Sequence, residues 1–242
     1  MREFITGLLP PDVKSRLKGF LHIPDMEFSL QRLSRVGFRP QATVDIGANA
    51  GDWSRMCRRV FPGTRILAIE PQVKCEASLR AMARDLGGVT IVQTLLGARA
   101  TAAVPFYVHE FSGISSVLRE PEAPAVDAVP VDMVTLDDLI ASEEFPQPAL
   151  IKLDVQGYEL EVLRGGSQAL AGAEVVLMEV NLLPIYEGAP LLHETVAFMT
   201  DNGFRAYDFC SAMRRPLDDA LFQTDMIFVR QDSPIIASKR WK

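Results

Sequence analysis

The sequence contains little cysteine and little histidine. Its 242 residues include three cysteines, Cys57, Cys75 and Cys210, which lie far apart and form no CxxC pair, and three scattered histidines. Such an odd, dispersed set forms neither a disulfide framework nor a zinc site. We therefore assign no metal site, and we expect a protein of the reducing cytoplasm, where thiols stay free.

The sequence also lacks an excess of positive charge and a long apolar run. Lys and Arg number 25 against 31 for Asp and Glu, which gives a net charge of −6. A protein that binds nucleic acid or anionic lipid through its overall charge needs a basic face. No stretch reaches the roughly 18 apolar residues that span a bilayer, and Pro10 and Pro11 interrupt the N-terminal region. We therefore predict no general nucleic-acid binding and no membrane span.

The chain does have the composition of one globular domain, with 48% hydrophobic and 23% charged residues. Within residues 1–40, apolar positions from Phe28 to Phe38 recur at helical spacing. We expect this region to form an N-terminal helical cap over a sheet edge or a site. Residues 41–232 would then form the main domain and residues 233–242 a tail.

From residue 42 to residue 93, short apolar runs alternate with helical stretches. The runs lie at 42–47, 65–69 and 89–93, with helices expected at 52–61 and 72–86. Strands and helices that alternate through short connections are typical of a parallel sheet with helices on both faces.

The pattern continues after an interruption in the middle of the chain. Pro105 marks 103–108 as an edge strand, and Pro121, Pro124 and Pro130 indicate a loop. Beyond them we expect strands at 150–154 and 175–180, a helix at 191–202, and an antiparallel terminal pair of strands at 204–209 and 225–229.

The turn after the first strand lacks the glycines of a dinucleotide-binding fingerprint. In the segment from Asp45 to Gly51, Asn49 stands where the second glycine would be, and no Gly-Lys-Ser/Thr follows. Gly47 and Gly51 still let the backbone turn tightly and approach a ligand without a Cβ in the way. The turn therefore disfavours NAD, excludes a nucleoside-triphosphate P-loop, and still suits a ligand.

A carboxylate follows the second strand. Glu70-Pro71 ends that strand 25 residues after Asp45, where a carboxylate can accept both hydroxyls of a ribose. A ribose-binding carboxylate without pyrophosphate glycines indicates S-adenosylmethionine, which has no phosphate, and Asp45 would face its methionine end. The residues predicted to bind this cofactor are Asp45, Gly47, Asn49, Gly51, Glu70 and Pro71.

Three stretches resemble one family of methyltransferases. VDIGANAG at 44–51, IEP at 69–71 and IKLDVQGYELEVLRG at 151–165 look like the FkbM-type S-adenosylmethionine-dependent methyltransferases. The resemblance implies the class I, Rossmann-like methyltransferase fold, a mostly parallel seven-stranded sheet with an antiparallel terminal strand and helices on both faces. It also implies methylation of a hydroxyl of a sugar or glycan, or of a secondary metabolite.

The sequence departs from this family at Gln156. Members often carry Glu there, in an Asp-Val-Glu-Gly string, whereas this chain has Asp154-Val155-Gln156-Gly157. If the family's Glu performed acid–base work, its loss would impair the protein. A residue on this tight turn would otherwise contact the cofactor or pack.

Two carboxylates are candidates for the chemistry. A sugar hydroxyl is a poor nucleophile, so a base must take its proton as the methyl bond forms. Asp154 ends the fourth strand of the expected sheet, as an acceptor ligand or base; it could instead cap the helix after Gly157, or hold a hard divalent cation. Glu179 ends an apolar strand, where burial raises the pKa of a carboxyl and suits a base. Its alternative is a structural ion pair.

The acceptor, a small molecule or glycan that carries a hydroxyl, would lie near further polar residues. These candidates are Ser115, Ser116, Tyr158, Glu159, Asn181, Tyr186 and His193, for several of which surface or packing positions are the alternative. Two rival functions stay open, a nicotinamide-dependent oxidoreductase of the same α/β class and a non-catalytic module that binds S-adenosylmethionine. No residue pattern sets the oligomeric state.

Overall fold

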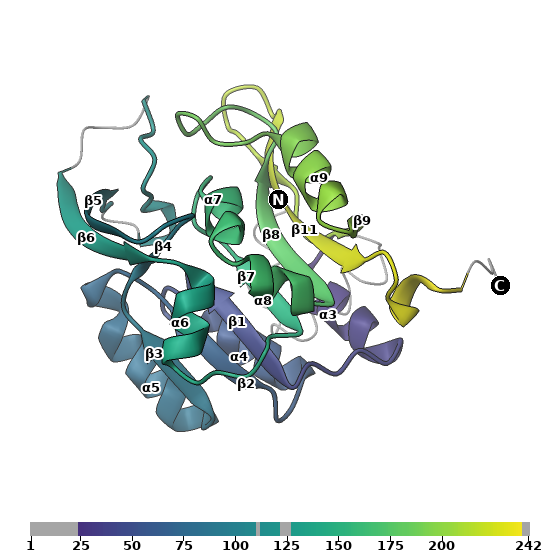
Figure 1. Ribbon diagram of the computed structural model, residues 1–242. Helices are drawn as coiled ribbons and strands as arrows, with labels where there is room; N and C mark the ends of the chain where they lie inside the picture. Colours follow the sequence, from purple (N-terminus) through teal and green to yellow (C-terminus); the bar gives the residue numbers. More distant parts are fainter. Residues whose placement is uncertain (1–23, 110–111, 122–126, 239–242) are drawn as a thin grey trace, which may run out of the picture.

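The computed structural model describes residues 24–109, 112–121 and 127–238 (Figure 1). Its centre is an eight-stranded sheet with the order β10-β11-β8-β7-β1-β2-β3, in which β9 also pairs with β11. The strands of this sheet are β1 Ala42–Ile46, β2 Arg65–Ile69, β3 Val89–Val92, β7 Leu150–Leu153, β8 Val175–Asn181, β9 Phe204–Phe209, β10 Met213–Arg214 and β11 Leu221–Arg230.

Most of this sheet is parallel. The five neighbouring strands from β3 to β8 pair in parallel, whereas β11 runs antiparallel to both β8 and β9. Every residue of β1, β7 and β8 is buried, which explains their apolar sequences, because a parallel strand at the centre is covered on both faces. The predicted fold is confirmed, and the two-residue strand β10 is an addition that the sequence did not indicate.

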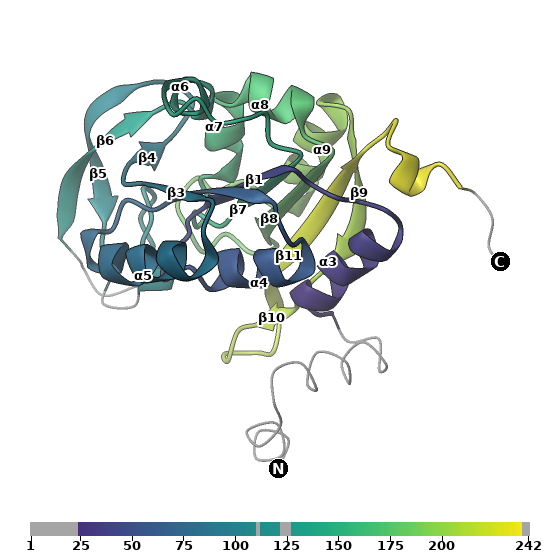
Figure 2. The ribbon, with the colours of Figure 1, turned by 90° about the horizontal axis from the view of Figure 1, so that it is seen from below.

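Helices cover both faces of the sheet (Figure 2). One face carries α3 Met26–Arg35, α4 Asp52–Val60 and α5 Glu76–Leu86, and the other carries α6 Leu136–Ser142, α7 Glu159–Arg164, α8 Ser167–Gly172 and α9 Leu192–Asp201. In α5, Leu79 and Met82 are fully buried against β2, and each such side chain stabilises the fold by about 1.5–3 kcal/mol. No helix in the described part of the chain is long and apolar enough to cross a membrane.

Between β3 and β7, the chain forms a second, three-stranded sheet. It has the order β4-β6-β5, from β4 Leu95–Leu96, β5 Thr101–Tyr107 and β6 Ala128–Val134. The expected edge strand is β5, at the outside of this sheet. The placement of Pro130 in a loop is wrong, because Pro130 lies in β6 opposite Pro105. Its missing N–H is tolerated because the pairing of β4 with β6 covers only Met133 and Val134.

The described part of the expected N-terminal cap, from residue 24, contains the helix α3; residues 1–23 lie outside the described residues. The carboxylate of Asp25 accepts a hydrogen bond from the backbone N–H of Phe28 (3.0 Å) and caps this helix. Leu30 and Leu33 are buried in one cluster with Trp53 of α4 and apolar residues of β8 and β11. The helix α3 therefore covers part of one sheet face.

Candidate active site

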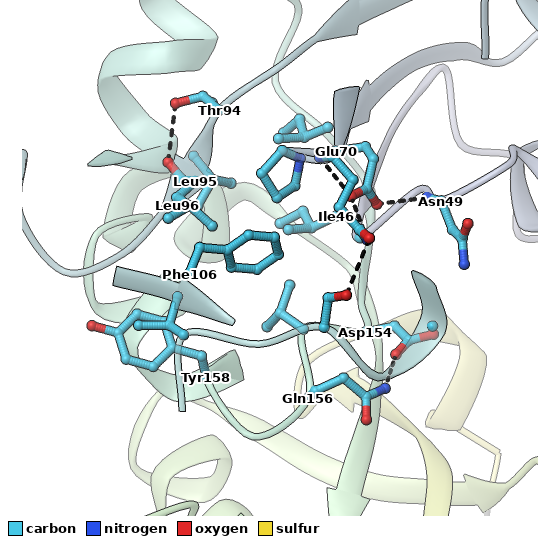
Figure 3. A pocket seen from close by; sticks show the side chains of 18 residues that line it. Ile46, Asn49, Glu70, Thr94, Leu95, Leu96, Phe106, Asp154, Gln156 and Tyr158 are labelled. Carbon is cyan, nitrogen blue, oxygen red and sulfur yellow. Dashed lines mark hydrogen bonds between the residues drawn. The ribbon is translucent and has the colours of Figure 1, made fainter. Parts of the chain in front are cut away.

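A pocket lies at the carboxyl ends of β1, β2 and β7 (Figure 3). Ile46 and Ile69 end the first two strands, and Asp154 follows the third. The small sheet supplies the opposite wall, and the ring of Phe106 points into the pocket from there. The lining side chains and backbone belong to Ile46, Gly47, Asn49, Ile69, Glu70, Pro71, Gln72, Thr94, Leu95, Leu96, Phe106, Gly113, Ser115, Val117, Asp154, Val155, Gln156 and Tyr158.

Gly47 is required where two turns of the pocket touch. Its φ is +73°, and a Cβ on it would lie 1.9 Å from the backbone oxygen of Asp154. Any side chain at this position would therefore push the β1 turn away from the β7 turn. Gly51, with φ of +89°, begins α4 and faces Met82 of α5; it does not line the pocket. Of the two glycines, Gly47 alone shapes the pocket directly.

Glu70 is buried at the pocket edge, with hydrogen bonds on both carboxylate oxygens. Oε2 accepts from the backbone N–H of Asn49 (2.8 Å). Oε1 accepts from the backbone N–H of Gln72 and from its side-chain amide (both 3.0 Å). Burial raises the pKa of Glu70 despite these donors. Oε1 thus accepts two hydrogen bonds, whereas Oε2 accepts one and keeps a lone pair that can accept from a ligand hydroxyl.

Lys152 is a buried cation in β7 that sequence reasoning missed. Its Nζ lies 3.2 Å from Oδ1 of Asp45 and 3.7 Å from Oδ2 of Asp154, and it donates to the carbonyl oxygen of Gly47 (2.9 Å). Burial disfavours its charge, but the two carboxylates outweigh that effect and raise the pKa of Lys152. A lone lysine between apolar residues of a buried strand was the signal that could have revealed it.

Asp45 lies behind the pocket, in the protein interior. It is fully buried, its Oδ2 accepts a hydrogen bond from the hydroxyl of Ser54 (2.6 Å), and its Oδ1 faces Lys152. It does not line the pocket. Its carboxylate thus anchors Lys152 and α4 beneath the β1 turn.

Asp154, Gln156 and Glu179 form one cluster. The side-chain amide of Gln156 donates to Oδ1 of Asp154 (2.8 Å) and to Oε2 of Glu179 (3.4 Å). The Asp154 side chain is 39% exposed, whereas Glu179 is buried and does not line the pocket. Burial, followed by the charges of Asp154, Glu159 and Asp225, raises the pKa of Glu179 well above its usual value. Asp154 is therefore the carboxylate of the pair that a ligand can reach.

Glu159 holds the turn that carries Asp154. Its Oε1 accepts from the backbone N–H groups of Val155 (3.0 Å) and Gly157 (3.2 Å). Burial raises the pKa of Glu159 to about 7, although these donors oppose the shift. The N-cap of α7 is Tyr158, so Asp154 does not occupy the capping position that the sequence left open. No group of three or more metal-ligating side chains lies within the described residues.

The structure gathers some of the predicted site residues and separates others. The predicted residues that line the pocket are Gly47, Asn49, Glu70, Pro71, Ser115, Asp154 and Tyr158. Those placed elsewhere are Asp45, Gly51, Ser116, Glu159, Glu179, Asn181, Tyr186 and His193.

Several of these outlying residues support the site. The hydroxyl of Ser116 donates to the backbone oxygen of Gln156 (2.9 Å), and the hydroxyl of Tyr186 donates to its side-chain oxygen (2.6 Å). Asn181 is buried and accepts from the amide of Gln223 (3.3 Å). His193 lies in a separate apolar hollow lined by leucines and Val196.

Gln72, Phe106 and the segment 94–96 line the pocket although the sequence did not indicate them. Gln72 had a local signal, since it stands two residues after Glu70 and bonds to it. Phe106 and residues 94–96 had none, because the small sheet brings them to the pocket through tertiary contacts.

The architecture defines the class of protein. A mostly parallel sheet with an antiparallel terminal strand, helices on both faces and a ligand pocket at the strand ends is the class I methyltransferase fold. The chain matches the methyltransferase FkbM domain over residues 45–206, about two thirds of its length. It therefore belongs to the FkbM methyltransferase family, and the resemblance seen in the sequence is confirmed.

Individual relatives are distant. A crystallised FkbM methyltransferase from Methylobacillus flagellatus KT shares the fold with a TM-score of 0.51 and 17% identity, over 77% of this chain and 43% of that one. The 2-O-methyltransferase NoeI of Sinorhizobium fredii is 22% identical over 206 residues, 78% of each chain. The hexuronic acid methyltransferase AglP of Haloferax volcanii is 39% identical over 51 residues. The chain thus spans about a fifth of AglP and less than half of the crystallised protein.

Proposed function

We propose that this protein is an S-adenosylmethionine-dependent O-methyltransferase that acts on a hydroxyl of a sugar, a glycan or a secondary metabolite. Family membership supports methyl transfer, and the names of NoeI and AglP support a sugar-type acceptor. The net charge of −6 argues against a nucleic-acid acceptor. The cysteines are free and buried, which suits a reducing compartment such as the cytoplasm.

The observation that carries this proposal is the charge of the pocket. Its described lining includes the two carboxylates Glu70 and Asp154, and no Lys, Arg or His. Such a wall suits a ligand that carries positive charge. S-adenosylmethionine is that kind of ligand, since it combines a nucleoside, an ammonium group and a sulfonium. The rival oxidoreductase is disfavoured because Asn49 stands where the dinucleotide-binding fingerprint has its second glycine.

The residues present fit the parts of this cofactor. Glu70 would accept a ribose hydroxyl through Oε2, because this oxygen accepts one hydrogen bond and keeps a free lone pair. Leu95, Leu96 and Phe106 form an apolar wall of the pocket, which would suit the adenine. Asn49 and the backbone of the β1 turn would face the methionine end.

Asp154 would act as the base on the acceptor. When bound, S-adenosylmethionine supplies a methyl group on a positively charged sulfur. The exposed part of the Asp154 carboxylate can accept the acceptor's hydroxyl proton, and the neighbouring residues Lys152 and Gln156 restrict its orientation. An oxygen held close to the methyl group and losing its proton is what an in-line transfer needs.

Two variants test the two ends of the pocket. By calorimetry with S-adenosylhomocysteine, Glu70→Ala should weaken binding about 10-fold or more, because it removes a charged hydrogen-bond acceptor. Asp154→Asn should keep that affinity and lose at least about 100-fold in turnover. Asp132→Asn, at an exposed carboxylate of β6, is the control. No binding to the wild type, or full turnover by Asp154→Asn with an acceptor screened by labelled methyl transfer, would refute the respective assignment.

A further inference from the structure

Gln156 uses every polar atom of its side-chain amide. One N–H points to Oδ1 of Asp154 (2.8 Å) and the other to Oε2 of Glu179 (3.4 Å). Its Oε1 accepts the hydroxyl of Tyr186 (2.6 Å). The residue is 7% exposed, so little water competes for these bonds. An amide has two N–H donors, and here each serves a different carboxyl group.

The surroundings fix which way round the amide lies. If it were turned over, its oxygen would face the oxygens of both Asp154 and Glu179, and its N–H groups would face the Tyr186 hydroxyl. Repulsion between the amide oxygen and the carboxylates disfavours that arrangement. The acids therefore set the direction of the amide, and the Tyr186 hydroxyl, which donates to Oε1, holds the amide in that position.

The backbone holds Gln156 in place at a conformational cost. Its φ is +57°, in the left-handed region that disfavours residues with a Cβ. The hydroxyl of Ser116 bonds to its carbonyl oxygen (2.9 Å), and Gly157 follows with φ of +94°. A buried non-glycine residue is thus kept in a costly conformation that directs its amide between the two carboxyl groups.

The electrostatic setting explains why a donor is needed there. Asp225 lies opposite Glu179 in the neighbouring strand, and Asp154 and Glu159 also act on Glu179 electrostatically. Lys152 lies on the other side of Asp154, with Nζ 3.7 Å from Oδ2. The other oxygen of Glu179, Oε1, is buried with no hydrogen-bond partner among the described residues. For Glu179, the amide of Gln156 is the hydrogen-bond donor that the described structure provides.

We infer that Gln156 is a positioning residue, whose amide, held by Tyr186, bridges Asp154 and Glu179 and holds the Asp154 carboxylate toward the acceptor. A glutamate at this position would lack both N–H donors and add a third acid. The bridge is a property of the folded protein, whereas its effect on turnover rests on the proposed methyl transfer.

The first test replaces the amide by a side chain of similar size without donors. In Gln156→Met, the pKa of Glu179, followed by carboxyl carbon NMR and assigned by its loss in Glu179→Gln, should rise by about one unit, because a donor to the charged form is gone. Gln168→Met, at an exposed glutamine of α8, should leave that value unchanged.

The second test removes only the hydroxyl that holds the amide. Tyr186→Phe should move the pKa of Glu179 in the same direction by less, because the amide keeps its donors but is held less firmly in position. Tyr207→Phe, on the exposed side of β9, is the matched control. This variant keeps the test decisive if Gln156→Met does not fold.

Turnover separates the inference from the proposed function. Gln156→Met should lose about 10- to 100-fold in kcat and less in affinity for S-adenosylhomocysteine. An unchanged pKa of Glu179 in both variants would overturn the bridge, and an unchanged kcat would overturn its effect on catalysis. A wild-type protein that binds no S-adenosylhomocysteine would refute the proposed function instead, and the NMR result would still decide the bridge.

Discussion

The two ends of the pocket are built by different means. At the Glu70 end, two of the three hydrogen bonds to the carboxylate come from backbone N–H groups. At the Asp154 end, the contacts join side chains, with Lys152 on one oxygen and Gln156 on the other. Backbone donors do not titrate, whereas a cluster of buried acids does. We therefore expect the Asp154 end, where several buried acids act on one another, to respond more strongly to charge and pH than the Glu70 end, which has one buried carboxyl.

Removal of the central cation should have the largest effect. Lys152→Met leaves Asp45 buried without its ion-pair partner, so the free energy of unfolding should fall by about 3–5 kcal/mol. Arg84→Met, at an exposed arginine of α5, should change it by less than about 0.5 kcal/mol. Denaturant unfolding measures both, and equal losses would show that the buried pair contributes nothing specific.

The buried acids should make stability depend on pH. The pKa of Glu159 is about 7 in the folded protein, above the 4.5 of an ordinary glutamate. As pH rises through this window, the unfolded chain releases the proton first, so the free energy of unfolding falls by up to about 3 kcal/mol. Glu159→Gln keeps the acceptor oxygen and removes this loss.

The measurement is the difference in unfolding free energy between the wild type and Glu159→Gln, taken from pH 4.5 to 7.5. As pH rises over this range, the unfolding free energy of the wild type should fall steadily relative to that of Glu159→Gln. Glu161→Gln, which changes a partly exposed carboxylate on the same helix, should show no such trend in this window. A difference for Glu159→Gln that does not vary with pH would contradict the assignment.

Disruption of the contact between the β1 turn at Gly47 and the β7 turn at Asp154 should have the smallest effect. Gly47→Ala and Gly63→Ala both place a Cβ at positive φ, +73° and +89°, but only the first meets a backbone oxygen. The alanine at position 47 should cost about 2 kcal/mol more than the one at position 63. Thermal unfolding of the two variants compares them directly, and equal costs would show that the turns separate freely.

The main sheet and the site carboxylates at its strand ends could be predicted from the sequence. Glu70 and Asp154 follow strands of an alternating α/β pattern, and such strand ends meet at one edge of the sheet. The strand at 103–108 was also predicted as an edge strand, because Pro105 cannot donate within a ladder. Local patterns were sufficient for these features.

The rest depended on contacts between distant segments. Phe106 reaches the pocket from the small sheet, 36 residues beyond Glu70. Pro130 is a residue type typical of loops but lies in β6. The neighbouring strand β4 is too short to reach it, so no hydrogen bond from its backbone nitrogen is needed. Asp45 and Glu179 carry charge at strand positions that suggest ligand contact, yet burial places both behind the pocket wall. Which side of a wall a carboxylate occupies is set by tertiary packing.

The facing prolines of the small sheet bear on self-association. Pro105 and Pro130 are directly opposite in β5 and β6, and the N–H and C=O of Tyr107, two residues from Pro105, point outward to Ser116. Because the backbone N–H groups of successive residues point to alternate sides of a strand, position 105 also faces the outer edge, where proline offers no donor. A second chain cannot extend the ribbon there by continuous backbone pairing. We therefore expect the two prolines to disfavour edge-to-edge pairing between copies of this sheet.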